Sequence, residues 1–231
     1  MNIFYKERFQ FLIYLYLSLS VLSITLILTY IDYDTFSRFL GDINPVLAIL
    51  ITIITGFSIF KFLLSKTQFV IYKKHNLKTY LIITSIAVIF GIEVIAADIW
   101  LVDYSADINI LFPKSLLFYP SIGYIVEVFF HLLPISLIII FLTSFKKFNI
   151  NIIVWISIII VSLIEPLYQI WFTDLSSLTT TIYTGIHVFL FSIIQLLIFK
   201  YLDFITMYLF RLIFYFIWHI LWGHFRLDLL F

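Results

Sequence analysis

Cysteine is absent from the 231-residue sequence, and charged residues are scarce. The first absence excludes disulfide bonds, cysteine-ligated zinc sites and thiol nucleophiles, so any metal would have to be bound by histidine and carboxylate side chains. Charged residues make up 12% of the chain, against about 25% in soluble domains. The formal net charge of +1 is not the basic excess of a nucleic-acid-binding protein, so no nucleic-acid partner is expected.

Apolar residues are correspondingly abundant: 63% of the chain is hydrophobic, and the mean hydropathy is +1.13. Soluble domains contain about 45–50% apolar residues. A soluble chain of this length has no core large enough to bury so much apolar surface, whereas membrane helices expose it to lipid. Membrane lipids are therefore expected partners. The frequent Ile, Phe, Leu, Lys and Asn residues are typical of an AT-rich bacterial genome, which favours a bacterial inner membrane.

Seven apolar stretches have about the length of 20 residues that a helix needs to cross a bilayer. The first is too long for the core of a signal peptide and is not followed by a cleavage pattern, which favours a retained anchor. We predict an all-α, polytopic integral membrane helix bundle, with residues 1–231 forming one transmembrane domain. The predicted spans cover residues 9–31, 46–64, 79–102, 116–142, 150–172, 182–199 and 205–222.

The basic residues are distributed unequally between alternate connections, and this predicts the orientation. Ten Lys or Arg residues would lie on the side of the N-terminus and three on the other side. Because basic loops stay in the cytoplasm, the N-terminus is predicted to be cytoplasmic. The ten are Lys6, Arg8, Lys61, Lys66, Lys73, Lys74, Lys78, Lys146, Lys147 and Lys200; the three are Arg38, Lys114 and Arg226.

The span 116–142 carries Glu127 and His131 near its middle, four residues apart and so on one helical face. A charged group at this depth costs about 2.5–3.5 kcal/mol on insertion scales unless it is paired or hydrated, so the pair marks a functional site. Other spans contribute further polar groups at overlapping depths, which favours one shared internal cavity. These groups are Glu93, Asp98, Glu165, Gln169, His187, Arg211 and His219.

Several of these residues have a structural alternative. Asp98 and His219 could simply reach the outer interface, and Arg211 could extend to lipid phosphates at the inner end of its span. Glu165 could bond backbone groups left free by the proline that follows it. His131 could hydrogen-bond across the bundle as a packing histidine.

Three short segments in the second half of the chain carry a resemblance to a known family. Residues 126–131 resemble the Glu-Glu-x-x-x-Arg motif of the CAAX-protease-and-bacteriocin-processing family of intramembrane proteases, including an aromatic residue before the last position. Residues 183–187 are similar to its Phe-x-x-x-His motif, and residues 219–223 to its His-x-x-x-Asn motif. The sequence departs from the family pattern at Val126, His131 and Gly223.

The resemblance implies an intramembrane endopeptidase that cleaves a membrane-bound peptide or protein. Glu127 would activate a water molecule as general base, while His187 and His219 would polarise that water or stabilise the oxyanion. His131, Glu165 and Gln169 would support them in place of the missing family residues. Glu127, His187 and His219 are also candidate ligands for a catalytic zinc ion, and metal dependence stays open.

Two other classes of function are open alternatives. A non-catalytic membrane subunit or immunity protein with a degenerate protease fold would use its polar residues to hold helices together. A small proton-coupled transporter would use intramembrane carboxylates as a relay, although the sequence has no inverted repeat of the kind common in transporters. Convergence of both histidines on Glu127 favours the peptidase, a continuous polar path favours the transporter, and separate polar pairs favour the non-catalytic protein.

Overall fold

The computed structural model describes residues 3–145, 149–172 and 177–231. Lys146 and Lys147, which the orientation prediction counts, lie outside the described residues. The described residues contain helices and no β-strand. Seven helical segments are long and apolar enough to cross a membrane, which confirms the prediction of an all-α polytopic bundle.

Four of the seven spans are single helices, and three are composed of shorter helices in series. The single helices are α2 (Arg8–Ile31), α4 (Pro45–Lys66), α5 (Leu77–Trp100) and α10 (Leu178–Tyr201). The composite spans are α6 (Ser115–Val126), η1 (Glu127–Leu132) and α7 (Leu133–Thr143); α8 (Ile150–Val161) and α9 (Ile164–Phe172); and α11 (Phe204–Tyr215), η2 (Phe216–Trp222) and α12 (Gly223–Leu230). Two short helices complete the chain, α1 (Ile3–Lys6) and α3 (Asp34–Leu40).

Polar side chains mark where several of these helices begin. The side chains of Asn44, Asn76, Asn149, Ser177 and Asp203 each accept a hydrogen bond from a backbone N–H in the first turn of the helix that follows. Such caps satisfy amide groups that have no partner within the helix. These caps place the helix starts at the predicted polar connections, so that the apolar sequence that follows lies within the spans.

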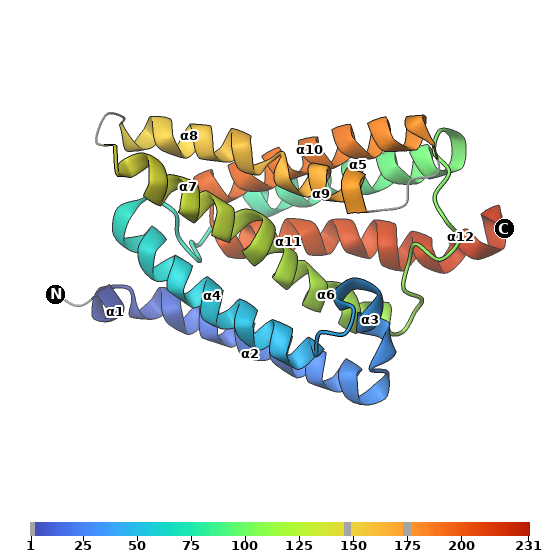
Figure 1. The fold of residues 1–231 in the computed structure, drawn as a ribbon, viewed down its shortest axis with the longest axis horizontal. Coiled ribbons are helices and arrows are strands. Elements are labelled where there is room, and N and C mark those ends of the chain that lie inside the picture. The colour runs from blue at the N-terminus through green and yellow to red at the C-terminus, as the bar shows by residue number, and fades with distance from the viewer. Residues whose placement is uncertain (1–2, 146–148, 173–176) are drawn as a thin grey trace.

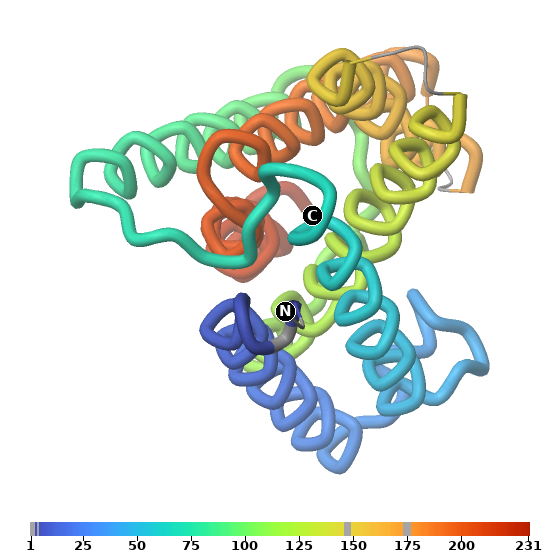
Figure 2. Tube along the Cα trace, turned by 90° about the vertical axis from the view of Figure 1, so that its left-hand side faces the viewer, coloured from blue at the N-terminus to red at the C-terminus, as the bar shows by residue number. Residues whose placement is uncertain are grey.

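The composite span α6–η1–α7 crosses obliquely between two groups of helices (Figure 1). One group contains α2 and α4, which pack on each other and on α6. The other contains α5, α8, α9 and α10, with α11 packed on both α5 and α10. Figure 2 shows the same oblique path from the N-terminal helices to α8. The middle of the crossing span therefore faces several helices at once, and it is here that Glu127 and His131 lie.

The connector between α4 and α5 joins the first span to the last one. The carbonyl groups of Val70 and Ile71 accept hydrogen bonds from the backbone N–H groups of Phe204 and Ile205. The Gln10 side chain accepts from the amides of Ile71 and Tyr72 and donates to the Tyr72 carbonyl at 2.8 Å. These bonds fix the start of α2 and the start of α11 against one extended segment.

The last span is longer than predicted. It was expected to end near residue 222, with Arg226 in the loop beyond, but helix continues to Leu230. The reason is that Arg226 is 2% exposed and donates to both carboxylate oxygens of Asp98 at 2.7 and 2.9 Å. The ion pair holds the additional turns against α5.

A close approach between α2 and α4 provides a test of this packing. Tyr14 is 1% exposed, and its hydroxyl donates to the Ile53 carbonyl at 2.9 Å. A Cβ added at Gly56 would clash with the Tyr14 hydroxyl and lie 3.1 Å from its Cζ. We expect Gly56→Ala to lower the free energy of unfolding by about 1–3 kcal/mol, measured by SDS titration of the protein in mild detergent micelles.

The loss of stability caused by Gly56→Ala should be smaller when the Tyr14 hydroxyl is removed as well. The Gly56→Ala effect measured in a Tyr14→Phe background should therefore be smaller than in the wild type. Ser58→Ala, on the exposed side of the same helix, serves as the control and should change stability little. An equal Gly56→Ala effect in both backgrounds would contradict the predicted close contact.

Candidate functional site

A buried ionic cluster lies at the centre of the crossing span. It consists of five residues from four elements: Glu127 and His131 on η1, Glu165 on α9, Gln195 on α10 and Arg211 on α11. Glu127, His131 and Gln195 are 0% exposed, Arg211 is 1% and Glu165 is 6% exposed. Side chains distant in sequence thus meet in one enclosed polar site.

Arg211 is the centre of this ionic cluster. Its Nε donates to Glu127 at 2.6 Å, and its two terminal nitrogens donate to the two oxygens of Glu165 at 2.9 and 2.8 Å. The same nitrogens also donate to the Tyr215 hydroxyl at 3.0 Å and to the side-chain amide oxygen of Gln195 at 2.8 Å. A planar guanidinium satisfies several acceptors in fixed directions, as this arrangement requires.

This geometry corrects two of the alternatives drawn from sequence. Arg211 does not extend to lipid phosphates, because its guanidinium is enclosed with two carboxylates. Glu165 does not bond the backbone near the following proline, because both of its oxygens accept hydrogen bonds from Arg211. Two carboxylates attract the cation inward more strongly than the interface attracts it outward.

Glu127 is fully engaged within the ionic cluster. One carboxylate oxygen accepts from Arg211 and from the Gln195 amide, and the other bonds Nδ1 of His131 at 2.8 Å. Both residues lie on η1, a π-helical turn. Such turns insert an extra residue into a helix and are frequent at functional sites. The turn is an additional reason to regard this region as specialised.

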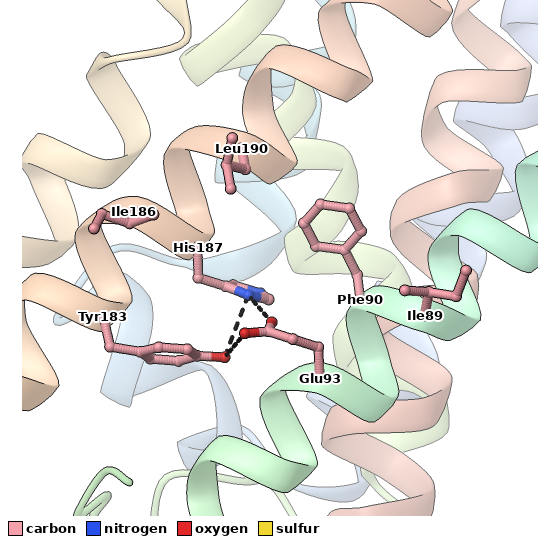
Figure 3. Close-up of a pocket in the computed structure, with 7 residues that line it drawn as sticks. All are labelled: Ile89, Phe90, Glu93, Tyr183, Ile186, His187 and Leu190. Atoms are coloured by element: carbon pink, nitrogen blue, oxygen red, sulfur yellow. Dashed lines mark hydrogen bonds and ion pairs between the residues drawn. The ribbon is translucent and has the colours of Figure 1, made fainter.

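A second polar site faces the outer surface of the bundle, between α5 and α10 (Figure 3). Nδ1 of His187 lies 2.6 Å from one oxygen of Glu93, and the Tyr183 hydroxyl donates to the other oxygen at 2.8 Å. The three side chains line a cavity of about 330 Å³, together with Ile89, Phe90, Ile186 and Leu190. We call it the lipid-facing pocket.

The lipid-facing pocket differs from the ionic cluster in being open. The Glu93 side chain is 48% exposed, and Ile89 and Ile186 on the rim are 64% and 56% exposed. Nε2 of His187 is buried and has no hydrogen-bond partner among the described residues. A molecule in the surrounding lipid could therefore reach the Glu93 carboxylate, to which the buried His187 is bonded, without passing through the bundle.

A third polar group lies near the end of the last span. Nδ1 of His219 is 2.6 Å from the Asn109 side-chain oxygen, and its ring stacks on Tyr119 at 4.5 Å between centroids. Nearby, Asp98 accepts from Trp222 at 2.7 Å and from Arg226. Asp98 therefore does not reach the interface as a free carboxylate, which corrects another alternative drawn from sequence.

The three predicted catalytic residues lie in different hydrogen-bond networks. Glu127 belongs to the ionic cluster, His187 to the lipid-facing pocket, and His219 bonds Asn109. Phe214 lies beside both histidines, with ring centroids 5.8 Å from His187 and 6.3 Å from His219. The expected single cavity is thus divided into separate sites, with aromatic side chains between them.

The structure does not assemble the zinc candidates Glu127, His187 and His219. Within the described ranges, no group of three or more His, Asp or Glu side chains is placed to hold a metal ion. Each of the three instead has a protein partner at hydrogen-bond distance.

The predicted supporting residues are only partly together. His131 and Glu165 belong to the ionic cluster, whereas Gln169 is half-buried one turn further along α9 and is not joined by the hydrogen bonds of the cluster. The amide in the cluster is Gln195, which sequence reasoning missed. The sequence feature that marks Gln195 is a single amide side chain in an apolar span. Counting the charged residues within the spans would also have suggested that Arg211 pairs with Glu127 and Glu165.

Ion pairs also join the polar connections outside the spans. Lys114 donates to Asp32, and this hydrogen bond, together with one from Thr35, holds the pKa of the Asp32 carboxyl below its usual value. Arg38 lies 3.4 Å from Asp107. Both pairs are partly exposed and link the connection after α2 to the one before α6.

Comparison with known proteins gives no relative: no family model, no curated protein and no solved structure matches the chain.

The ionic cluster predicts an unequal effect of two arginine substitutions. Arg211→Leu leaves two buried carboxylates without their cation, and breaking a buried pair in this way costs about 3–5 kcal/mol of stability. Arg38→Leu removes a partly exposed pair, worth about 0–1 kcal/mol. SDS titration of both variants should show this difference. Equal stability of the two variants would mean that the cluster does not hold the bundle together.

Proposed function

We propose that the protein is an intramembrane endopeptidase that hydrolyses a peptide bond of a membrane-embedded substrate at the lipid-facing pocket. The observation that carries this proposal is the pairing of Glu93 with His187 at 2.6 Å in a cavity of about 330 Å³ on the outer surface of the bundle. The resemblance of residues 183–187 to a family motif also supports a functional role for His187.

The chemistry follows from the hydrogen bonds of the pair. An ionised carboxylate only accepts hydrogen bonds, so Nδ1 of His187 carries the proton that binds Glu93, and Nε2 has a free lone pair. The half-exposed Glu93 carboxylate would take a proton from water as the water oxygen attacks the scissile carbonyl carbon, and would then return that proton to the departing amine as the C–N bond breaks. His187 and Tyr183, which both donate to Glu93, hold the carboxylate in position for this transfer.

This proposal replaces the carboxylate that the sequence suggested. Glu127 was expected to activate the water, but its oxygens accept hydrogen bonds from Arg211, Gln195 and His131 inside a closed cluster. A general base needs access to the proton that it removes. Glu93, on the pocket wall, is held by His187 and Tyr183 and is exposed enough to meet a substrate.

The test compares membranes of cells that lack the gene after reintroduction of the wild type, Glu93→Gln or His187→Gln. His224→Gln serves as the control, because His224 is an exposed histidine outside the pocket. Mass spectrometry of peptide termini should show cleavage products with the wild type and the control. Removing the base should reduce their rate of formation by about 10²–10⁴-fold. Unchanged products with Glu93→Gln, at equal protein level, would refute the peptidase.

A specific observation favours a second candidate, a non-catalytic membrane subunit. Most of the intramembrane polar groups in the described chain are paired inside closed contacts, as Arg211 is with Glu127 and Glu165, and Arg226 with Asp98. Pairs of this kind hold helices together. The same comparison of peptide termini separates the two functions, because a subunit would produce no difference between wild type and Glu93→Gln.

We also propose that the protein lies in a bacterial inner membrane with its N-terminus in the cytoplasm. The excess of basic residues on that side supports this orientation. The absence of cysteine makes it directly testable, because Lys74→Cys and Asp42→Cys would each introduce a single thiol at an exposed position. In spheroplasts, a membrane-impermeant maleimide should label Asp42→Cys and not Lys74→Cys. The reverse labelling would overturn the orientation.

A further inference from the structure

The charges of the buried ionic cluster do not balance when its histidine is neutral. Glu127 and Glu165 contribute two carboxylates, and Arg211 contributes one cation. All three lie within helices of membrane-spanning length. An uncompensated charge enclosed in a membrane protein is costly, and such groups are paired or neutralised.

Other groups around the ionic cluster supply no second cation. The side chains outside the cluster that hydrogen-bond to it are Ser192 on α10 and Tyr215 on α11. Neither of these is positively charged. In the part of the chain that the structure describes, no other Lys or Arg forms an ion pair with either carboxylate. Among the groups of the described chain, a proton bound to His131 or to a carboxylate is what can complete the balance.

The hydrogen bonds place that proton at the contact between Glu127 and His131. One oxygen of Glu127 accepts from Arg211 and Gln195, and the other lies 2.8 Å from Nδ1 of His131. Each oxygen of Glu165 accepts from a different terminal nitrogen of Arg211, so a protonated Glu165 would direct its O–H at a donor, and Glu165 is therefore ionised. Between Glu127 and His131, Nδ1 holds the proton, because an imidazole is ordinarily more basic than a carboxylate and Arg211 already donates to Glu127.

His131 is the remaining group that can hold a proton, and both of its nitrogens face carboxylates. Nδ1 is 2.8 Å from Glu127, and Nε2 is 3.7 Å from Glu165. Nε2 is also buried without a hydrogen-bond partner. In a neutral imidazole protonated at Nδ1, the lone pair of Nε2 would face the Glu165 carboxylate and repel it. An imidazolium presents an N–H to each carboxylate.

We propose that the ionic cluster is a proton-binding site, in which one proton is held as the imidazolium of His131 between Glu127 and Glu165. Two cations then balance two carboxylates, and the enclosed cluster is neutral. This inference stands on the geometry of the cluster and is independent of the peptidase proposed for the lipid-facing pocket.

The test is ¹⁵N solid-state NMR of histidine-labelled full-length protein in lipid bilayers at about pH 8.5, two units above the usual histidine pKa of about 6.5. The other four histidines are assigned by His75→Gln, His187→Gln, His219→Gln and His224→Gln, which leave the cluster unaltered. His131 is then assigned by elimination. We expect both of its nitrogens to be protonated, and the exposed His224 serves as the control signal.

A second variant tests the charge balance itself. Glu165→Gln removes one negative charge and retains an oxygen that can accept from Arg211, so the cluster becomes neutral without a proton. We expect His131 to lose its second proton in this variant and to show one unprotonated nitrogen at about pH 8.5. A neutral His131 in the wild type would overturn the proposal, and so would an imidazolium that persists unchanged in Glu165→Gln.

Discussion

The bidentate contact between Arg211 and Glu165, extended to Glu127, is the interaction around which the bundle is arranged. It joins η1, α9 and α11, and Gln195 adds α10. In lipid, apolar side chains gain little by leaving one hydrocarbon environment for another, so packing and polar contacts determine which helices meet. A guanidinium that must satisfy two buried carboxylates permits few alternative arrangements of four helices.

Smaller polar pairs act in the same way nearer the ends of the spans. Arg226 binds Asp98 and so holds α12 against α5. His75 bonds Asp203 at 2.7 Å, where the connector after α4 meets the start of α11. Each pair joins elements that are far apart in sequence, and each leaves its members enclosed. A polar residue that would destabilise an isolated span in lipid therefore stabilises the bundle once its partner in another span is in contact with it.

The sequence was sufficient to predict the spans, because length and hydropathy are properties of single segments. It also identified most residues of the polar sites, since an ionisable group in an apolar run is conspicuous. It did not predict their pairing. Arg211 lies about 10 Å from the start of its span at 1.5 Å per residue, which is compatible both with the interface and with the cluster. Only the positions of Glu127 and Glu165 in other helices show that Arg211 belongs to the cluster and not to the interface. Hydropathy does not specify which helices pack against each other.

The same limit explains why Glu127 was expected to meet His187 and His219. All three lie at overlapping depths, but depth does not specify which face of a helix a residue occupies once π-helical turns intervene. Both η1 and η2 contain such residues, Glu127 and His219. An extra residue in a turn changes the direction of every side chain after it relative to a regular helix. His187, on the uninterrupted helix α10, instead bonds Glu93 of α5, whose side chain is about half exposed. The enclosed pairs hold helices together, whereas packing does not account for an exposed carboxylate within a span, and this is the physical ground for proposing chemistry there.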